Sequence, residues 1–252
     1  MQHSTWIKIL ATVSVGIVVG SGAFWQHRLR PLQTMTVTKT DIPTVFVAGD
    51  YARAFSTNGF VHRLSQAHLM TKALVVNVSY HGQVHVQKVA PLKNNPTIQV
   101  IFADNHHSKR QARQLITVMR VLKQRYHITR YNAVGHSSGG NIIFDYLTMA
   151  PKTGVPQINK FVTIASTYPR AKTAIKRLPS NLPILNIAGQ IWSTSGDGEV
   201  ALKPVLAFST ALKAAGYAPV THVIHGSPFT AEHSMLHINP VVDRLIVEFL
   251  YA

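Results

Sequence analysis

The sequence predicts an α/β fold with a mostly parallel central sheet and helices on both faces. Short apolar runs that are typical of buried strands alternate with amphipathic helical stretches up to the end of the chain. The length of 252 residues and the hydrophobic content of 46% suit one domain with a large core. A third observation is the turn Gly135-His136-Ser137-Ser138-Gly139, which lies between an apolar strand and an apolar helical stretch.

Residues 1–33 are expected to be a signal peptide or membrane anchor with a linker, followed by one domain over residues 34–252. Ile9 to Trp25 contains no charged side chain, and basic residues flank it on both sides. This stretch is short for a bilayer span and long for a signal-peptide core, so an uncleaved anchor and a removed signal both stay open. Its three glycines disfavour a buried helix of the domain. We therefore expect an extracytoplasmic protein at the cell surface, either anchored or secreted.

Composition narrows the classes of function. The absence of cysteine excludes disulfides, thiolate metal sites and a cysteine nucleophile, and it agrees with a Gram-positive surface protein. The formal net charge of +16 favours contact with anionic partners such as a cell wall or a membrane surface. The basic residues are scattered and form no known nucleic-acid signature, so no specific nucleic-acid binding is expected. Nothing in the composition indicates an oligomeric state.

The first half of the domain is expected to supply the strands around the turn. A linker over residues 31–40 runs into a first short strand, because apolar and basic residues alternate there with threonines. Apolar runs then predict buried strands, and an alternating run predicts a hairpin partner for the second of them. In chain order these are Ile42 to Ala48, Ala73 to Val78 with its hairpin partner Gln83 to Lys88, and Thr97 to Ala103.

Ser108 to Tyr126 is the clearest predicted helix. Its apolar residues recur on one face, and Ser108 with Gln111 predicts a capping box at its start. The preceding His106 and His107 raise the possibility of a metal site. Adjacent loop histidines do not easily share a coordination face, and no third ligand stands at a useful spacing, so we expect no metal.

The second half continues the alternation of strands and helices. One segment, Thr167 to Asn181, lacks strong periodicity and is expected to form at most a small cap over the sheet. The remaining elements are strands at Lys160 to Ser166, Pro183 to Ala188 and Val220 to His225, a helix at Pro204 to Ala215, and a final helix that Asn239-Pro240 caps and that runs to Leu250.

The turn at residues 135–139 has the G-x-S-x-G pattern of a nucleophile elbow. Ser137 would lie at the tip of a strained strand-to-helix turn with its hydroxyl exposed, and Gly135 and Gly139 would leave room for close backbone contacts. The amide of Ser138, in the first helical turn, would donate to a developing oxyanion. The same pattern also occurs by chance in glycine-rich loops, but the flanking strand and helix favour the elbow.

A serine nucleophile needs a histidine as general base and a carboxylate that orients it. Asp197, with glycines on both sides in a loop after a predicted strand, is the preferred carboxylate, and Glu199 is the reserve. His233 and His237 precede the last helix, and both are candidates for the base. Two other histidines, His222 and His225, lie within a predicted strand and are interpreted as structural.

The chain resembles the α/β-hydrolase superfamily, and more closely the Gram-positive cell-surface α/β hydrolases catalogued as a domain family of unknown function. The resemblance extends over roughly residues 35 to 252 and depends on a combination of motifs. They are Pro43-Thr44-Val45-Phe46-Val47, Val134-Gly135-His136-Ser137-Ser138-Gly139-Gly140, Gly196-Asp197-Gly198-Glu199-Val200 and His233-Ser234-Met235-Leu236-His237-Ile238-Asn239-Pro240.

The resemblance implies specific site residues. It selects His233, seven positions before the proline of the last helix, and Asp197, three before a valine. The loop after the first central strand, expected over Gly49 to Gly59, would donate the second oxyanion amide, from Asp50 or, as second choice, Tyr51. Relatives usually have His-Gly-Tyr-Gly-Gly where this chain has residues 48–52, so the Asp50 carboxylate would have to point away from the oxyanion.

The resemblance therefore implies a serine hydrolase of the carboxylesterase or lipase kind that acts on a small-molecule ester through an acyl-enzyme and needs no cofactor. Two alternatives use the same fold differently. One is a catalytically decayed basic protein that binds anionic cell-wall polymer or lipid, since fold does not imply function. The other is an acyltransferase or peptidase with the same catalytic residues.

Overall fold

The computed structural model describes residues 24–51, 54–169 and 171–252, without the side chains of residues 54–56. The predicted anchor or signal at Ile9 to Trp25 therefore lies almost wholly outside the described residues. Residues 24–33 are helical, and Leu32 is buried in the core, so packing begins slightly before residue 34. Among the helices of the described ranges, none has the length and apolar character needed to cross a membrane.

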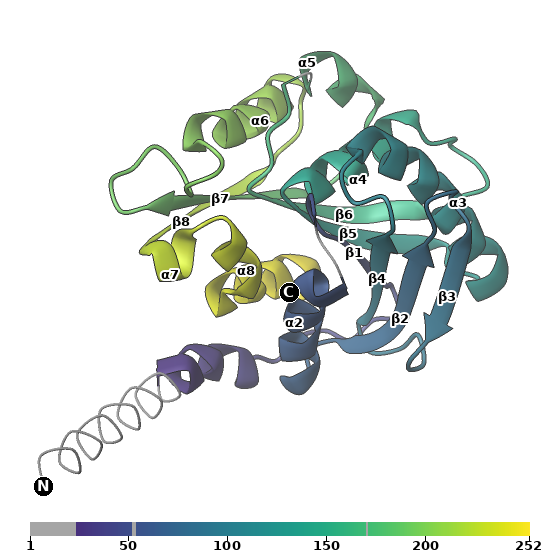
Figure 1. The fold of residues 1–252 in the computed structure, drawn as a ribbon, viewed down its shortest axis with the longest axis horizontal. Coiled ribbons are helices and arrows are strands. Elements are labelled where there is room, and N and C mark those ends of the chain that lie inside the picture. The colour runs from purple at the N-terminus through teal and green to yellow at the C-terminus, as the bar shows by residue number, and fades with distance from the viewer. Residues whose placement is uncertain (1–23, 52–53, 170) are drawn as a thin grey trace, which may run out of the picture.

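An eight-stranded sheet forms the centre of the molecule, in the order β3-β2-β4-β1-β5-β6-β7-β8 (Figure 1). Every neighbouring pair is parallel except β2 and β3, which form the predicted antiparallel hairpin. This arrangement confirms the predicted α/β fold with a mostly parallel sheet. The strands are β1 (Thr44–Val47), β2 (Thr71–Val78), β3 (Val84–Lys88), β4 (Pro96–Phe102), β5 (Arg130–His136), β6 (Gln157–Ile164), β7 (Ile184–Ile191) and β8 (Val220–Gly226).

Helices cover both faces of the sheet. Helices α3, α4 and α6 contribute buried side chains to one core cluster, and α2 and α8 contribute to the other. In Figure 1 the first group lies above the sheet and the second below it. The helices are α2 (Ala54–Gln66), α3 (Ser108–Tyr126), α4 (Ser138–Met149), α5 (Ala171–Ala174), α6 (Leu202–Ala214), α7 (Pro228–Ala231) and α8 (Pro240–Tyr251), with 3₁₀ turns η1 (Ile175–Arg177) and η2 (Ser234–Ile238).

Strand β1 shows why these residues occupy the middle of the sheet. All four of its residues are buried, and successive side chains point to opposite faces. Val45 and Val47 pack in the core beneath α3 and α4, whereas Phe46 packs in the core with α2 and α8. A continuous apolar run is needed because both faces are covered. The loop that follows β1 consequently begins at the centre of the carboxyl edge of the sheet.

Three local predictions are wrong. Residues 35–40 form no strand, because β1 is already paired on both sides and the segment makes single bonds instead, such as Thr38 N to Tyr251 O at 3.2 Å. The helix α3 starts at Ser108, but its N-cap is His107 and no side chain caps it. The turn closes one residue early, since the amides of Arg110 and Gln111 both donate to the His107 carbonyl.

The third correction concerns the loop after β1, which was expected to extend from Gly49 to Gly59. Helix α2 already begins at Ala54, so Gly59 is a helical residue and the loop is short. The cap region is also short: between β6 and β7 the described chain forms only the one-turn helices α5 and η1. The carboxyl edge near β1 and β5 therefore carries few covering residues, and its pocket opens to solvent.

Candidate active site

The turn from β5 into α4 has the strained geometry of a nucleophile elbow. Ser137 has φ 55° and ψ −130°, a backbone conformation that is rare for a residue with a side chain. A Cβ on Gly135 would lie 2.5 Å from the Gly140 amide nitrogen, and one on Gly139 would lie 2.2 Å from the Val47 carbonyl oxygen. Both distances are far below contact, so glycine is required at each position. These contacts press the elbow against β1 and leave Ser137 at the tip of the turn.

A carboxylate and an imidazole from distant loops meet above this turn. His233 Nδ1 lies 2.9 Å from Asp197 Oδ2, and both side chains are almost fully buried. The backbone reinforces the contact, because the His233 amide donates to the Asp197 carbonyl at 3.0 Å. A neutral imidazole that donates from Nδ1 carries its free lone pair on Nε2. The arrangement thus sets the tautomer that a general base for a serine would need.

The loop after β7 holds the Asp197 carboxylate in a fixed orientation. Oδ1 accepts hydrogen bonds from the amides of Glu199 (3.0 Å) and Val200 (2.6 Å), and Oδ2 is left for His233. A Cβ on Gly196 would lie 2.1 Å from the Val200 carbonyl oxygen, which explains the glycine before the aspartate. The Asp-x-x-Val spacing in the sequence therefore has a structural explanation, because the valine amide donates a hydrogen bond to the aspartate carboxylate.

The three histidines of the pocket differ in their electrostatics. Burial alone would lower the pKa of His233, but the hydrogen bond and charge of Asp197, with the charges of Glu199 and Glu232, raise it above its usual value. Burial lowers the pKa of His237, and the nearby Arg63 charge lowers it further. The pKa of His136 lies well below its usual value, first through burial and then through its histidine neighbours. Of the three, His233 is the one whose cation the protein stabilises.

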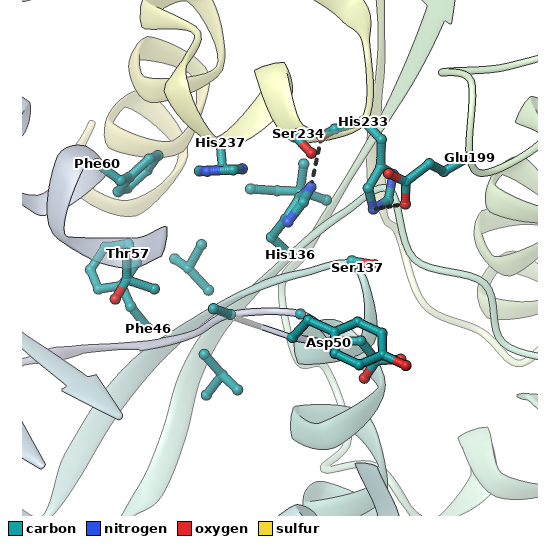
Figure 2. Close-up of a pocket in the computed structure, with 16 residues that line it drawn as sticks. Phe46, Asp50, Thr57, Phe60, His136, Ser137, Glu199, His233, Ser234 and His237 are labelled. Atoms are coloured by element: carbon teal, nitrogen blue, oxygen red, sulfur yellow. Dashed lines mark hydrogen bonds and ion pairs between the residues drawn. The ribbon is translucent and has the colours of Figure 1, made fainter. Parts of the chain in front are cut away.

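Ser137 and His233 line the same pocket, which has a volume of about 480 Å³. Figure 2 shows the His233 ring above Ser137, with Glu199 beside the ring and Asp50 on the opposite side of the serine. Within the described residues the Ser137 hydroxyl has no hydrogen-bond partner, and Glu199 Oε2 lies 3.7 Å from His233 Nε2. Hydrogen bonds between a nucleophile and its base are often longer in free enzymes than in reacting complexes. Ser137 and His233 thus both line a pocket that a small molecule could enter.

The loop after β1 lies directly against the serine. A Cβ on Gly49 would lie 2.8 Å from Ser137 Cβ and 3.3 Å from its Oγ, so the backbone of this loop borders the nucleophile. The Asp50 carboxylate accepts a hydrogen bond from the Ser138 hydroxyl at 2.7 Å. The carboxylate is therefore held over the start of α4. The amide of Tyr51, the second choice for an oxyanion donor, is already bonded to the Asn105 carbonyl at 2.8 Å, which disfavours that role.

His136 was not singled out from the sequence as a site residue, yet it connects the elbow to the base. Its Nε2 donates to the His233 carbonyl at 2.9 Å, and its ring lies 4.7 Å from that of His233 and 5.0 Å from that of His237. His237, kept as an alternative base, lines the pocket with its Nδ1 buried and without a partner. Among the described residues, no carboxylate forms an ion pair with His237, whereas Asp197 pairs with His233.

Further contacts that the sequence analysis missed hold the histidine loop in place. The Glu232 carboxylate accepts the amides of Ser234 and Met235, at 3.0 and 3.1 Å. Arg63 of α2 forms a bidentate pair with the buried Asp243 and also donates to the His237 carbonyl at 3.0 Å. No short motif marks the contacts of Arg63, because its partners lie 174 and 180 positions away in the sequence. Together they tie the loop to α2 and α8.

The adjacent histidines before α3 have a structural explanation. His107 Nδ1 lies 2.8 Å from the buried Asp104 carboxylate, and Arg110 approaches the same carboxylate at 3.3 Å. His106 instead stacks on Tyr51, with ring centroids 4.8 Å apart. Among the described residues, no three histidine, aspartate or glutamate side chains are placed to hold a metal ion together.

The sheet topology and the strained serine turn define an α/β-hydrolase fold. The chain belongs to the family described as alpha/beta hydrolases of unknown function (DUF915), whose model matches residues 32–175 and 171–252. This agrees with the resemblance seen in the sequence.

Solved structures agree with this fold. The product of the lin2722 gene of Listeria innocua is 25% identical, with a TM-score of 0.74 over 83% of this chain and 93% of that one. A proposed cell-surface hydrolase from Lactobacillus plantarum WCFS1 is 23% identical, with a TM-score of 0.67 over 86% of this chain and 91% of that one. No curated protein matches the chain by sequence.

Proposed function

We propose that the protein is a serine hydrolase that cleaves carboxylic esters with Ser137, His233 and Asp197 as its catalytic triad. The observation that carries the proposal is the 2.9 Å contact between the buried Asp197 and His233, which lines the same pocket as the strained Ser137. Ser137 follows β5, Asp197 lies in the loop after β7, and His233 lies after β8. Their chain order, Ser, Asp, His, is the one that α/β hydrolases use.

In this mechanism the Ser137 oxygen attacks the ester carbonyl carbon while His233 Nε2 takes the hydroxyl proton. The buried Asp197 stabilises the resulting imidazolium, in keeping with the raised pKa of His233. The amides of Asp50 and Ser138 would donate to the oxyanion, which is where the negative charge develops. His233 then returns the proton to the departing alcohol, and a water molecule hydrolyses the acyl-enzyme by the same steps in reverse.

The pocket suggests a substrate class. At the end away from the serine, Figure 2 shows Phe46 and Phe60 together with Thr57. Aromatic surface of this kind binds the apolar part of a ligand mainly by excluding water from it. With a volume of about 480 Å³ and little cap above it, the site would accept esters of small or medium acyl groups.

We also propose an extracytoplasmic location at the cell surface. Two features support this location: the uncharged stretch Ile9 to Trp25 and the net charge of +16. Only the last two residues of that stretch are among the described residues. Such a charge would favour an anionic cell wall or membrane nearby. The description of the Lactobacillus protein as a proposed cell-surface hydrolase agrees with this location.

A fluorophosphonate probe tests the catalytic proposal directly. We expect the wild-type protein to be labelled at Ser137 and the Ser137→Ala variant to remain unlabelled, because the probe needs an activated serine. Ser138→Ala serves as a matched control, since it changes the neighbouring hydroxyl and leaves the nucleophile. Labelling that persists in Ser137→Ala, or no labelling of the wild type, would contradict the proposal. A panel of esters of increasing chain length, with and without added alcohol acceptors, then separates hydrolysis from acyl transfer.

A further inference from the structure

A second concave site lies on the other side of the loop that carries Asp197. It is a groove of about 1,030 Å³ between α5 with η1 and helix α6, which we call the α6 groove. In Figure 1 these helices lie together above the sheet, well apart from α2 and α8. Of the described residues, none lines both this groove and the Ser137 pocket. The proposed catalytic mechanism does not use it.

The floor of the groove is a second apolar face of α6. Val205, Phe208 and Leu212 fill the inner face of this helix and are buried in or against the core. Apolar residues also line the groove side of α6, where Ala207 is exposed and Leu202, Leu206 and Ala211 are half-buried. A surface helix normally carries polar residues on its outer face. This apolar strip lies in a groove of the surface, where an apolar ligand could be shielded from water on one side.

The rim of the groove is positively charged. Lys172, Lys176 and Lys203 line it, and all three are exposed. Among the residues that the structure describes, none of these ammonium groups forms an ion pair with a carboxylate. The helices α5, η1 and α6 together carry lysine or arginine at five positions and no acidic residue. Unpaired lysines beside an apolar floor are complementary to a ligand with an anionic head and an apolar body.

We propose that the α6 groove binds a single long acyl chain with an anionic head group, such as a fatty acid. The outer face of α6 from Leu202 to Ala214 extends over roughly 18 Å at 1.5 Å per residue, which suits a long unbranched chain. The chain would lie on the alanine and leucine floor, and the head group would contact the lysines. The floor has no aromatic side chain on which a nucleic-acid base could stack.

The α6 groove continues towards the catalytic edge. A smaller groove of about 520 Å³ shares Lys172, Ala207 and Ala211 with it and reaches Thr167 and Tyr168 after β6. Ser166, which precedes Thr167, contacts the elbow, because its hydroxyl donates a hydrogen bond to the Ser137 carbonyl at 2.7 Å. A bound chain would thus extend behind the serine rather than into its pocket. The proposal does not depend on the proposed hydrolase function, because binding requires no turnover.

The test compares ligands that have the same sixteen-carbon chain and differ in the charge of their head group. Binding of palmitate, hexadecanol and hexadecylamine to the full chain is measured by displacement of a fluorescent fatty acid, below the concentrations at which the ligands aggregate. We expect palmitate to bind at least about tenfold more tightly than the other two, equivalent to about 1.4 kcal/mol. Equal affinity for the three ligands, or no binding of palmitate, would overturn the proposal.

Two variants locate the site, each with a matched control. Replacing Lys172, Lys176 and Lys203 together by glutamate should weaken palmitate binding at least about tenfold, and Ala207→Trp should weaken it by filling the groove. The controls are Lys88, Lys93 and Lys109 replaced together by glutamate, which makes the same change in net charge, and Gln124→Trp on α3; all four residues are exposed and lie outside α5, η1 and α6. Thermal unfolding verifies that each variant is folded.

Two results besides loss of selectivity would overturn the proposal. If palmitate bound both groove variants as tightly as the wild type, its acyl chain would have to bind elsewhere on the protein. Sedimentation with phosphatidylglycerol vesicles but no binding of monomeric palmitate would identify a membrane-docking surface instead. Ester hydrolysis is measured in the same samples. Its absence would count against the proposed hydrolase function and would leave the binding result intact.

Discussion

The elbow at Ser137 and the loop after β1 lie against each other at the centre of the sheet, but different forces determine their shapes. In the elbow, a Cβ on Gly139 would lie 2.2 Å from a backbone oxygen of β1, so the geometry is fixed by contact between backbones. In the loop, the Asp50 side chain is substantially exposed and contacts Ser138 through a hydrogen bond and His106 at 3.9 Å, and the Tyr51 amide adds one backbone hydrogen bond to Asn105. A structure fixed by backbone contact tolerates almost no change, whereas one held by an exposed side chain tolerates many.

This difference explains how the loop departs from the pattern of relatives without a visible disturbance of the elbow. The oxyanion donor that the loop would supply is a backbone amide, so the identity of its side chain matters only through its direction and charge. Asp50 directs its carboxylate to the hydroxyl at the start of α4. The requirement noted from the sequence was that this carboxylate point away from the oxyanion, and its direction is set by the hydrogen bond from the Ser138 hydroxyl.

Gly139→Ala should have the largest effect, because it acts on the rigid side of the comparison. The added methyl cannot fit unless α4 moves away from β1, and we expect the free energy of unfolding to fall by about 3 kcal/mol or more. Urea unfolding of the purified variant measures this change, and labelling by the fluorophosphonate probe should be lost as well.

Gly59→Ala is the matched control for that substitution. Gly59 is also a helical glycine, but a Cβ there would meet only the end of the Arg63 side chain, at 3.7 Å. Alanine favours a helix by roughly 0.8–1 kcal/mol over glycine, so this variant should be as stable as the wild type or more so. Equal destabilisation of both variants would mean that steric fit at the elbow is not what makes Gly139 necessary.

Gly49→Ala should separate activity from stability. The new methyl would press on Ser137 from the loop side, and the loop can move away from it more easily than α4 can move from β1. We expect a loss of about 10²–10³ in kcat, the usual cost of losing an oxyanion donor, with roughly 1 kcal/mol or less of stability. Ester kinetics and urea unfolding on one preparation give both numbers. A variant as active as the wild type would remove this loop from the oxyanion hole.

The same distinction decides what the sequence could predict. Short-range features were predicted well: the buried strand runs, the bounds of α3 and the elbow itself depend on residues close together in the chain. The approach of His233 to Asp197 also follows, because loops at one edge of a parallel sheet converge. The catalytic roles of these residues stay predictions until the serine probe is applied.

The features that the sequence did not predict depend on pairs of residues far apart in the chain. Nothing near Arg63 indicates its partner Asp243, which lies 180 positions later, and the bond from His136 to the His233 carbonyl leaves no local pattern either. The strand expected over residues 35–40 was wrong for a similar reason. Its alternation was correct for a strand, but β1, the next strand along the chain, is already paired with β4 and β5.

The pH profile tests whether Glu199 belongs to the electrostatics of the base. His233 must be neutral to accept a proton, so kcat/KM should rise with pH through the raised pKa of His233 in the free enzyme. The charge of Glu199 is one of the causes that raise the pKa of His233. Glu199→Gln should therefore lower this pKa and move the acid limb of the kcat/KM profile to lower pH. Glu248→Gln, on the far end of α8, should leave the profile in place. An unmoved limb in Glu199→Gln would mean that solvent screens the contact at 3.7 Å.

The smallest effect is expected from Asp50→Ala, on the tolerant side of the comparison. The change removes the hydrogen bond to the Ser138 hydroxyl but keeps the Asp50 amide, so we expect kcat to fall by roughly two- to tenfold, the worth of one hydrogen bond. Asp50→Asn keeps an acceptor for Ser138 and should fall less. If Asp50→Ala were instead as damaging as Gly49→Ala, the carboxylate itself would be fixing the loop. The loop would then be held as strictly as the elbow, by a side chain rather than by backbone contact.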